Sequence, residues 1–431
     1  MKTTLILFFV SFLSTSTCVA DSAYPLRLED ASAVYLVPGR FHVRGDGVAD
    51  DSAAVQAAID EVQATKGEGI VFIPQGRYSI TRTIYLWPGI RIIGYGTQRP
   101  VFVLGDRTPG YQAGIAYMFF FAGAKPGDGE KSRRPESLHV RTPPTQPGVV
   151  PPSLTVPDAN PGTFYSAMSN VDFEVGADNA GAVAIRFHAA QHAYLSHMDF
   201  NMGSGFAGVH EVANIAEDLH FHGGQFGIMA RKPSPAWQFT LVDSSFDGQR
   251  EAAIRENEAG LTLVHDEFHN VPTAISIDSH YSDQLWIKDS FFDNISGPAV
   301  LISDETSRMT EINFEDVVCR HVPVFAKFRE SGRQFLQPAD IYHVGVFSHG
   351  LGLTSIGALA DIKTRFDASP IRSFPATSAP AGIPRPWYSQ AFVANSCWRI
   401  QRNHRDRNFY RRPQQSCCRP PLALGTSLAR R

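Results

Sequence analysis

The sequence predicts an all-β protein, a single-stranded right-handed parallel β-helix (a solenoid) with an N-terminal capping helix. Two observations lead to this prediction. A pattern of short strands repeats seven times between residues 166 and 330, and an amphipathic helix precedes the first strands. A fixed period of this kind is typical of solenoids, in which each coil buries its apolar side chains against the next coil.

The capping helix is expected from Ser52 to Ala64. Asp50 and Asp51 are N-cap candidates, because a short carboxylate accepts hydrogen bonds from the free N–H groups of a first helical turn. Gly67 and Gly69 are expected to end the helix. Its apolar stripe consists of Ala54, Val55, Ala58, Ile59 and Val62. Short strands are expected to follow over residues 70–73, 78–80, 84–86 and 90–93.

Each repeat has the order apolar, any, apolar, any, polar, any, any, large apolar. The closing apolar positions, 21 to 27 residues apart, are Phe173, Phe200, Phe221, Phe246, Phe268, Phe292 and Cys319. The polar positions are Asn170, His197, Asp218, Asp243, His265, Asp289 and Asp316. We expect the first column to stack in the interior. We interpret the second as a ladder of turns rather than a metal site, because Asn and Asp tolerate left-handed backbone and bond it locally.

The chain begins with a pattern typical of a secretory signal peptide over residues 1–20. Lys2 precedes a short apolar run over residues 5–13, and the small residues before Asp21 suit cleavage near Ala20. The run is too short to span a bilayer. We therefore expect a secreted or periplasmic protein without a membrane anchor after cleavage. The formal net charge of −3 gives no support for nucleic acid as a partner.

The β-helix is expected over residues 33–360, with a Pro- and Gly-rich insertion over residues 123–162. Residues 361–431 form a linker and an irregular Arg- and Cys-rich tail, for which disorder and a reading-frame error are the two interpretations. Cys319 is the one cysteine of the predicted β-helix, so no disulfide framework is expected there.

Three motifs in order resemble the opening of the pectate-lyase-like parallel β-helix superfamily. They occupy residues 45–59, 71–78 and 90–96, and with the repeats the resemblance covers residues 33–330. It implies that the opening helix caps the solenoid and shields its open edge, so Asp50 and Asp51 are structural. This superfamily includes polysaccharide lyases, phage tailspikes, rhamnogalacturonase/epimerase-like proteins, polygalacturonases and family 55 β-1,3-glucanases.

The resemblance leaves the chemistry open. The polygalacturonase signatures Asn-Thr-Asp, Gly-Asp-Asp and Gly-His-Gly are absent. Family 55 enzymes resemble two solenoids side by side, whereas the pattern of this sequence indicates one solenoid.

In such β-helices the substrate groove usually lies along the sheet whose strands place a small residue before a branched one, as in Ala253-Ile254. Outward residues of successive coils line up there about 4.8 Å apart. The candidate catalytic residues are Glu256, Asp278 and Glu211, and the candidate substrate-binding residues are Arg231, Arg255, His210 and His280. Arg186 and Glu305 belong to the same expected strip. A second, less favoured strip consists of His222, Asp247, His269 and Asp293.

Carboxylates flanked by Arg and His suit the cleavage of sugar chains. A glycosidase needs a carboxylic acid and a carboxylate across the scissile bond. A lyase needs a base, and cations or Ca²⁺ on the uronate carboxylate. The sequence therefore predicts a secreted hydrolase or lyase acting on an extracellular polysaccharide, with no cofactor or metal unless a lyase uses Ca²⁺. The alternatives are a non-catalytic glycan-binding or structural β-helix, and a truncated, inactive half of a two-solenoid glucanase.

Overall fold

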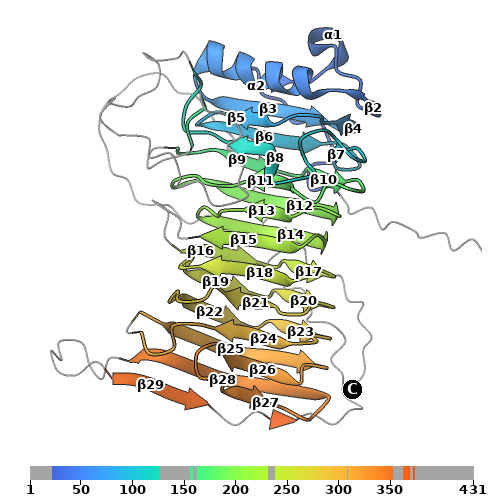
Figure 1. Ribbon diagram of the computed structural model, residues 1–431. Coiled ribbons are helices and arrows are strands. Elements are labelled where there is room, and N and C mark those ends of the chain that lie inside the picture. The colour runs from blue at the N-terminus through green and yellow to red at the C-terminus, as the bar shows by residue number, and fades with distance from the viewer. Residues whose placement is uncertain are drawn as a thin grey trace, which may run out of the picture. The chain divides into compact units, whose positions relative to one another are not determined.

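The computed structural model describes residues 22–126, 156–158, 163–231, 238–307, 309–352, 363–368 and 372–373. In this part the chain winds as a parallel β-solenoid of about 10 turns, with its strands stacked along one axis (Figure 1). The predicted fold class is confirmed. The predicted signal peptide over residues 1–20, most of the insertion over residues 123–162 and most of the tail over residues 361–431 lie outside the described residues. No helix among the described residues is long and apolar enough to cross a membrane.

The described strands form two sheets. The large sheet contains β1 (Val34–Tyr35), β2 (Asp46–Asp50), β3 (Gly69–Pro74), β4 (Arg77–Ser79), β6 (Ile90–Tyr95), β7 (Val101–Leu104), β9 (Ala167–Ser169), β10 (Asp172–Val175), β12 (Tyr194–Gly203), β14 (Ile215–Gly223), β16 (Phe239–Val242), β17 (Ser245–Asp247), β19 (Leu261–Val264), β20 (Glu267–His269), β22 (Gln284–Lys288), β23 (Phe291–Asp293), β25 (Glu311–Arg320), β28 (Ile341–Gly352), β29 (Lys363–Ala368) and β30 (Arg372–Ser373). The small sheet contains β5 (Ile84–Leu86), β8 (Ala116–Phe121), β11 (Ala182–Arg186), β13 (Ala207–His210), β15 (Phe226–Arg231), β18 (Ala252–Asn257), β21 (Ile275–Ile277), β24 (Pro298–Ile302), β26 (Val324–Phe328) and β27 (Gln334–Leu336).

Helix α2 (Ser52–Lys66) covers the first coil, above β3 and β5 (Figure 1), and the short helix α1 (Pro38–Phe41) precedes it. The buried face of α2 includes Val55, Ile59 and Val62, which have no exposed surface. Gly67 ends the helix with a left-handed φ of 75°. The helix therefore closes the end of the core, as the sequence predicts.

The two aspartates before α2 act differently from the expected caps. Asp51 occupies the N-cap position, but its carboxylate accepts hydrogen bonds from the backbone N–H groups of Arg44 (2.7 Å) and Gly45 (2.9 Å). The Asp50 carboxylate accepts hydrogen bonds from the N–H and hydroxyl groups of Ser52. Both aspartates thus fix the loop that leads into the helix, which agrees with their structural interpretation.

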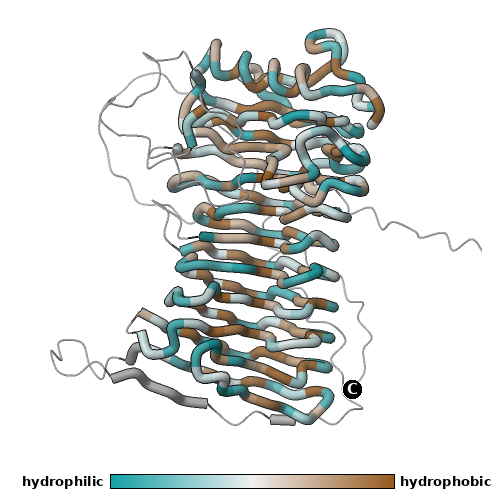
Figure 2. Tube along the Cα trace, viewed as in Figure 1, coloured by the Kyte–Doolittle hydropathy of each residue, from teal (hydrophilic) through white to brown (hydrophobic). Residues whose placement is uncertain are grey.

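The interior contains the predicted aromatic column. Its six phenylalanines and Cys319 have no exposed surface and are paired in register from coil to coil. The rings of Phe246 and Phe268 lie 5.0 Å apart and are 2° from parallel. Apolar residues recur in every coil (Figure 2). Because each ring is in contact with the ring of the next coil, the column joins the coils into one core.

The predicted ladder of turns is also confirmed. All seven polar positions have left-handed backbone, with φ between 49° and 58°. They are Asn170, His197, Asp218, Asp243, His265, Asp289 and Asp316. Among the described residues, no group of three or more His, Cys, Asp or Glu side chains has the arrangement of a metal site.

Two antiparallel pairings follow the last parallel coil. Strand β28 runs antiparallel to β25, and β27 runs antiparallel to β26. These strands lie at the end of the described solenoid opposite α2 (Figure 1). The parallel winding therefore stops at Phe328, and the strands that follow cover the last coil.

Candidate functional site

The small sheet carries an outward column of polar residues. Arg186, His210, Met229 and Arg255 are paired in register across β11, β13, β15 and β18. Side chains alternate between the two faces of a strand, so the flanking positions face the interior. This column contains two of the predicted site residues, His210 and Arg255.

Around His210 the structure brings five polar side chains together, which we call the Glu211 centre: Tyr117, Arg186, His210, Glu211 and Arg231. The Glu211 Oε1 atom accepts hydrogen bonds from Arg231 Nε (2.8 Å) and Nη2 (2.6 Å). His210 Nε2 lies 3.5 Å from the same oxygen, and His210 Nδ1 lies 2.7 Å from the Tyr117 hydroxyl. Three predicted residues, His210, Glu211 and Arg231, are therefore in contact.

The charges of the Glu211 centre follow from its burial and its neighbours. Burial raises the pKa of Glu211, but His210, Arg186 and Arg231 outweigh it and lower that pKa to about 2. Burial lowers the pKa of His210 to about 4. Burial also raises the pKa of Tyr117 to about 12. At neutral pH the centre therefore holds an ionised carboxylate, a neutral imidazole and a neutral phenol.

Asp158, from the end of the predicted insertion, contacts this centre. Its Oδ2 atom lies 2.6 Å from Arg186 Nη2 and 3.1 Å from His188 Nδ1. Burial raises the pKa of Asp158, but Arg186 and His188 lower it by more than burial raises it. The pKa is therefore below its usual value, and the group is ionised at neutral pH.

Two buried atoms of the Glu211 centre, Arg186 Nη1 and His210 Nε2, have no hydrogen-bond partner among the described residues. Unpaired buried polar atoms are rare because each one loses its hydration. These two atoms therefore retain unused hydrogen-bonding capacity inside the Glu211 centre.

Further along the small sheet lies a second group, the Asp278 centre: Arg255, Ser276, Asp278 and Arg329. Arg255 Nε donates a hydrogen bond to Asp278 Oδ1 at 2.8 Å. Arg329 Nη2 donates one to the Ser276 hydroxyl at 3.0 Å. Burial lowers the pKa of Arg329, partly offset by Asp278, and Arg255 lowers it further. With two guanidinium groups and one carboxylate, this centre has a net positive charge.

The expected outward position of Glu256 is wrong. Glu256 follows Arg255 in β18, so it faces the interior, and it has no exposed surface. There it lies within hydrogen-bonding distance of Asp283, which is also buried. Burial and the Asp283 carboxyl group raise the pKa of Glu256 well above its usual value, and burial raises the pKa of Asp283. The two groups therefore share a proton inside the core.

The remaining predicted residues are less closely connected. His280 is exposed, and its backbone N–H donates a hydrogen bond to the Ser303 hydroxyl at 2.8 Å. Glu211 and Asp278 belong to coils three steps apart, which corresponds to about 14 Å at the usual strand spacing. The repeat pattern does not reveal Tyr117, Asp158 or Arg329, because Tyr117 and Asp158 precede the repeats, which begin at residue 166, and Arg329 follows the last coil of the predicted strip.

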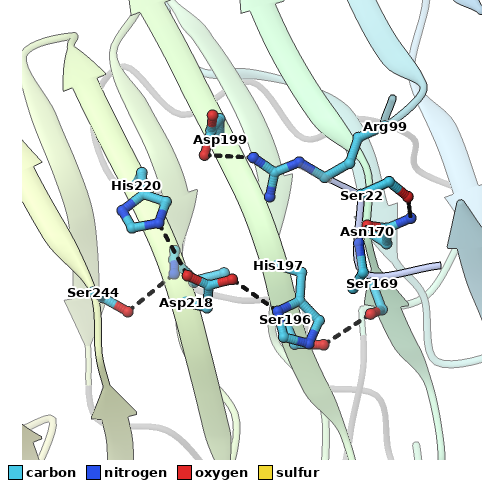
Figure 3. Close-up of polar contacts among 12 residues, drawn as sticks. Ser22, Arg99, Ser169, Asn170, Ser196, His197, Asp199, Asp218, His220 and Ser244 are labelled. Carbon is cyan, nitrogen blue, oxygen red and sulfur yellow. Dashed lines mark hydrogen bonds and ion pairs between the residues drawn. The ribbon is translucent and has the colours of Figure 1, made fainter. Parts of the chain in front are cut away.

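The second strip lies on the outward face of the large sheet, where His222, Asp247, His269 and Asp293 are paired in register. On the same sheet, Asp218 bridges two histidines (Figure 3). Its oxygens lie 2.8 Å from His197 Nδ1 and 3.0 Å from His220 Nε2.

Nearby, the Arg99 side chain lies between Asp172 (3.0 Å) and Asp199 (2.8 Å). Burial raises the pKa of Asp172 to about 7, against the effect of Arg99. Like the contacts of Asp218, these join adjacent coils, and we interpret both groups as structural clamps.

The comparisons with known proteins agree with the fold. Residues 39–116 match the rhamnogalacturonase A/epimerase, pectate lyase-like family. A 50-residue segment is 48% identical to a glucan 1,3-beta-glucosidase of Cochliobolus carbonum, and it amounts to 12% of this chain and 6% of that protein. The match therefore spans a small part of that relative's length.

Two solved structures have a related backbone. The catalytic unit of an alpha-1,3-glucanase from Streptomyces thermodiastaticus is 13% identical, over 73% of this chain and 58% of that one, with a TM-score of 0.44. The A-module of a mannuronan C-5 epimerase from Azotobacter vinelandii is 12% identical, over 68% of this chain and 88% of that one, with a TM-score of 0.33. Scores this low carry no argument about activity. The family match over residues 39–116 and the described solenoid together confirm the resemblance seen in the sequence: the chain winds as a parallel β-solenoid, and its opening segment matches a pectate lyase-like family.

Proposed function

We propose that this protein is a secreted enzyme that cleaves an extracellular polysaccharide, with the reacting sugar bound at the Glu211 centre. Its membership of a carbohydrate-active fold family supports the general class. The observation that carries the assignment to this centre is the unpartnered His210 Nε2 atom, which lies beside the Glu211 carboxylate and two guanidinium groups. The imidazole is neutral at pH 7, so it has a nitrogen lone pair for a proton, and the Glu211 carboxylate favours the imidazolium that would form, against burial and the two guanidinium groups.

Eliminative cleavage fits this set of groups. His210 would take the C5 proton next to a uronate carboxylate, and Glu211 would stabilise the imidazolium that forms. The C4–C5 double bond would then form as the C4–O bond breaks, and the leaving glycosidic oxygen would take a proton from water. Arg186 and Arg231 would hold the uronate carboxylate, whose charge makes the proton easier to remove. All four groups belong to the Glu211 centre, so eliminative cleavage would require no residue from elsewhere in the small sheet.

Hydrolysis is the second candidate, and the matched segment of the glucan 1,3-beta-glucosidase favours it. A glycosidase needs two carboxyl groups about 5–9.5 Å apart. Glu211 and Asp278 are farther apart than this, and Glu256 faces the core. No two of the three predicted carboxylates therefore meet the requirement. A hydrolase would therefore need another carboxyl group near Glu211, which an inactive half of a two-solenoid glucanase would lack. Asp158 is a candidate, because it contacts Arg186 in the Glu211 centre and the Glu211 charge acts on its pKa.

The test is incubation of the purified protein with pectate, alginate and β-1,3-glucan. Ultraviolet absorbance from an unsaturated product marks a lyase, and new reducing ends without that absorbance mark a hydrolase. We expect His210→Ala to lower turnover by about 10²–10⁴-fold, the usual effect of removing a proton-transfer group. The control is Glu305→Gln, since Glu305 belongs to the expected strip but lies outside both centres.

Thermal unfolding of each variant separates a loss of chemistry from a loss of fold. Full activity in a folded His210→Ala variant would move the reaction away from the Glu211 centre. An intact wild-type chain without activity on any polysaccharide would favour the non-catalytic or truncated alternatives.

A further inference from the structure

A half-exposed tryptophan stands on the face of the large sheet. In β22 the side chains of Leu285 and Ile287 face the interior, so Trp286 between them faces outward, with 49% of its surface exposed. Alternation in a regular strand sets this direction, and the ring is not part of the core. A single exposed apolar side chain is common on protein surfaces, so its surroundings decide what it does.

The neighbours of Trp286 are polar and lie in a row. Thr262 and Asn313 are its register partners on the adjacent coils, about 4.8 Å to either side. The Asn313 Oδ1 atom accepts a hydrogen bond from the Ser348 hydroxyl at 2.7 Å, which leaves the Asn313 amide nitrogen as a donor. The indole ring is thus flanked on both sides by groups that can bond hydroxyls.

The residue types around Trp286 favour a polysaccharide over a protein or a nucleic acid as the ligand. A sugar ring has an apolar face of C–H groups, which packs on an aromatic ring, and a rim of hydroxyls for hydrogen bonds. A protein partner would need a wider apolar patch than one ring among threonine and asparagine. A nucleic acid would meet Glu315, which pairs with Lys288 at 3.0 Å beside the ring, and would gain no basic stripe.

We propose that Trp286, with Thr262 and Asn313, forms a second, non-catalytic binding site for polysaccharide. It lies on the large sheet, whereas the Glu211 and Asp278 centres lie on the small sheet. The site would hold a long or insoluble polysaccharide on the protein while another stretch of sugar is free to reach the reacting centre. The choice of ligand class rests on the proposed function, but binding at Trp286 requires no turnover.

The experiment is affinity electrophoresis of the whole protein through gels containing pectate, alginate or β-1,3-glucan. We expect at least one of these polysaccharides to retard the wild-type protein. Trp286→Ala should weaken that binding about 3- to 10-fold, the usual value of one aromatic contact. Trp286→Phe should retain part of the retardation, because it keeps a ring. Tyr165→Ala is the matched control, since Tyr165 is an aromatic residue of similar exposure (46%) that stacks on His192 elsewhere.

Turnover of a short soluble oligosaccharide should be the same in Trp286→Ala as in the wild type. Wild-type binding by Trp286→Ala, an equal loss in Tyr165→Ala, or no retardation of the wild type would each overturn the proposal. A wild-type protein that is retarded in a Trp286-dependent way but cleaves nothing would refute the proposed function alone. Cleavage without retardation would refute the second site alone.

Discussion

The Glu256–Asp283 pair places two carboxyl groups inside the solenoid. Among the residues that the structure describes, neither group has an oppositely charged side chain in contact, so two negative charges at this depth would be strongly unfavourable. A shared proton removes one of the two charges. The pair therefore stabilises the fold as long as it retains its proton.

This sharing makes the stability of the protein depend on pH. The pKa of each group is raised in the folded protein. The stability that the protonated pair contributes is therefore fully present below the pKa of the unfolded state, about 4.5, and is lost as pH rises through the pKa of the folded state. One proton corresponds to a slope of about 1.4 kcal/mol per pH unit in the free energy of unfolding. We expect Glu256→Gln to reduce this slope and to be at least as stable as the wild type at pH 8.

Urea unfolding between pH 5 and pH 8 measures the slope. The control is Glu305→Gln, since Glu305 is not among the groups that shift the pKa of Glu256 or Asp283. An unchanged slope in Glu256→Gln would mean that the pair is not the source of the pH dependence.

The site shows why residue positions were harder to predict than the fold. A shift of one residue in register moves a side chain from one face of a strand to the other. The prediction for Glu256 failed in this way: Arg255 faces outward, and Glu256, one residue later in the strand, faces the interior. Tyr117 contacts His210 across 93 residues of sequence, and the period of the repeats contains no information on such a contact.

Among the elements, the aromatic column restricts the size of the side chains that pack against it. A Cβ atom on Gly227 would lie 2.5 Å from Cδ1 of Phe246. A Cβ atom on Gly208 would likewise lie 2.6 Å from Cδ1 of Phe221, so these two small-sheet glycines make room for rings of the column. The column and the ladder of turns were predictable, because both need one residue type at one position of every repeat.

Truncation of the column should be costly. We expect Phe246→Ala and Phe268→Ala to destabilise the protein by about 3–5 kcal/mol each, as buried aromatic truncations do. Gly227→Ala should cost about 1–3 kcal/mol through overpacking. In a protein that already carries Phe246→Leu, Gly227→Ala should cost less stability than it does in the wild type, since leucine leaves free the space that the added methyl group needs. Denaturant unfolding of the two single variants and the double variant measures this coupling, and strict additivity would show that the two residues do not compete for space.

At the scale of the whole molecule, the cap at the first coil protects an open end. The first coil has no preceding coil to pair with, and an uncovered edge of β-strands readily pairs with another chain. Helix α2 covers this end with residues that have no exposed surface.

A charge under the helix should therefore expose the end. We expect Ile59→Asp to lift α2 and to cause concentration-dependent association, because an unpaired charge cannot remain in the core. Ala57→Asp is the control, since Ala57 lies on the exposed face of the same helix and should change stability by less than about 0.5 kcal/mol. Light scattering after mild heating compares the two. Equal behaviour would show that the helix is not a protective cap.

The reversed strand β28 has a consequence for how such a chain gains length. A solenoid is enlarged most simply by tandem duplication of one coil, here a unit of 21 to 27 residues. A duplicated unit placed between β17 and β23 finds parallel neighbours in the same register on both sides. A unit placed after β25 would instead meet β28, which accepts only an antiparallel neighbour in its present pairing. Duplications are therefore tolerated in the middle of the stack and selected against at this end, so the newest coils of the protein should be internal ones.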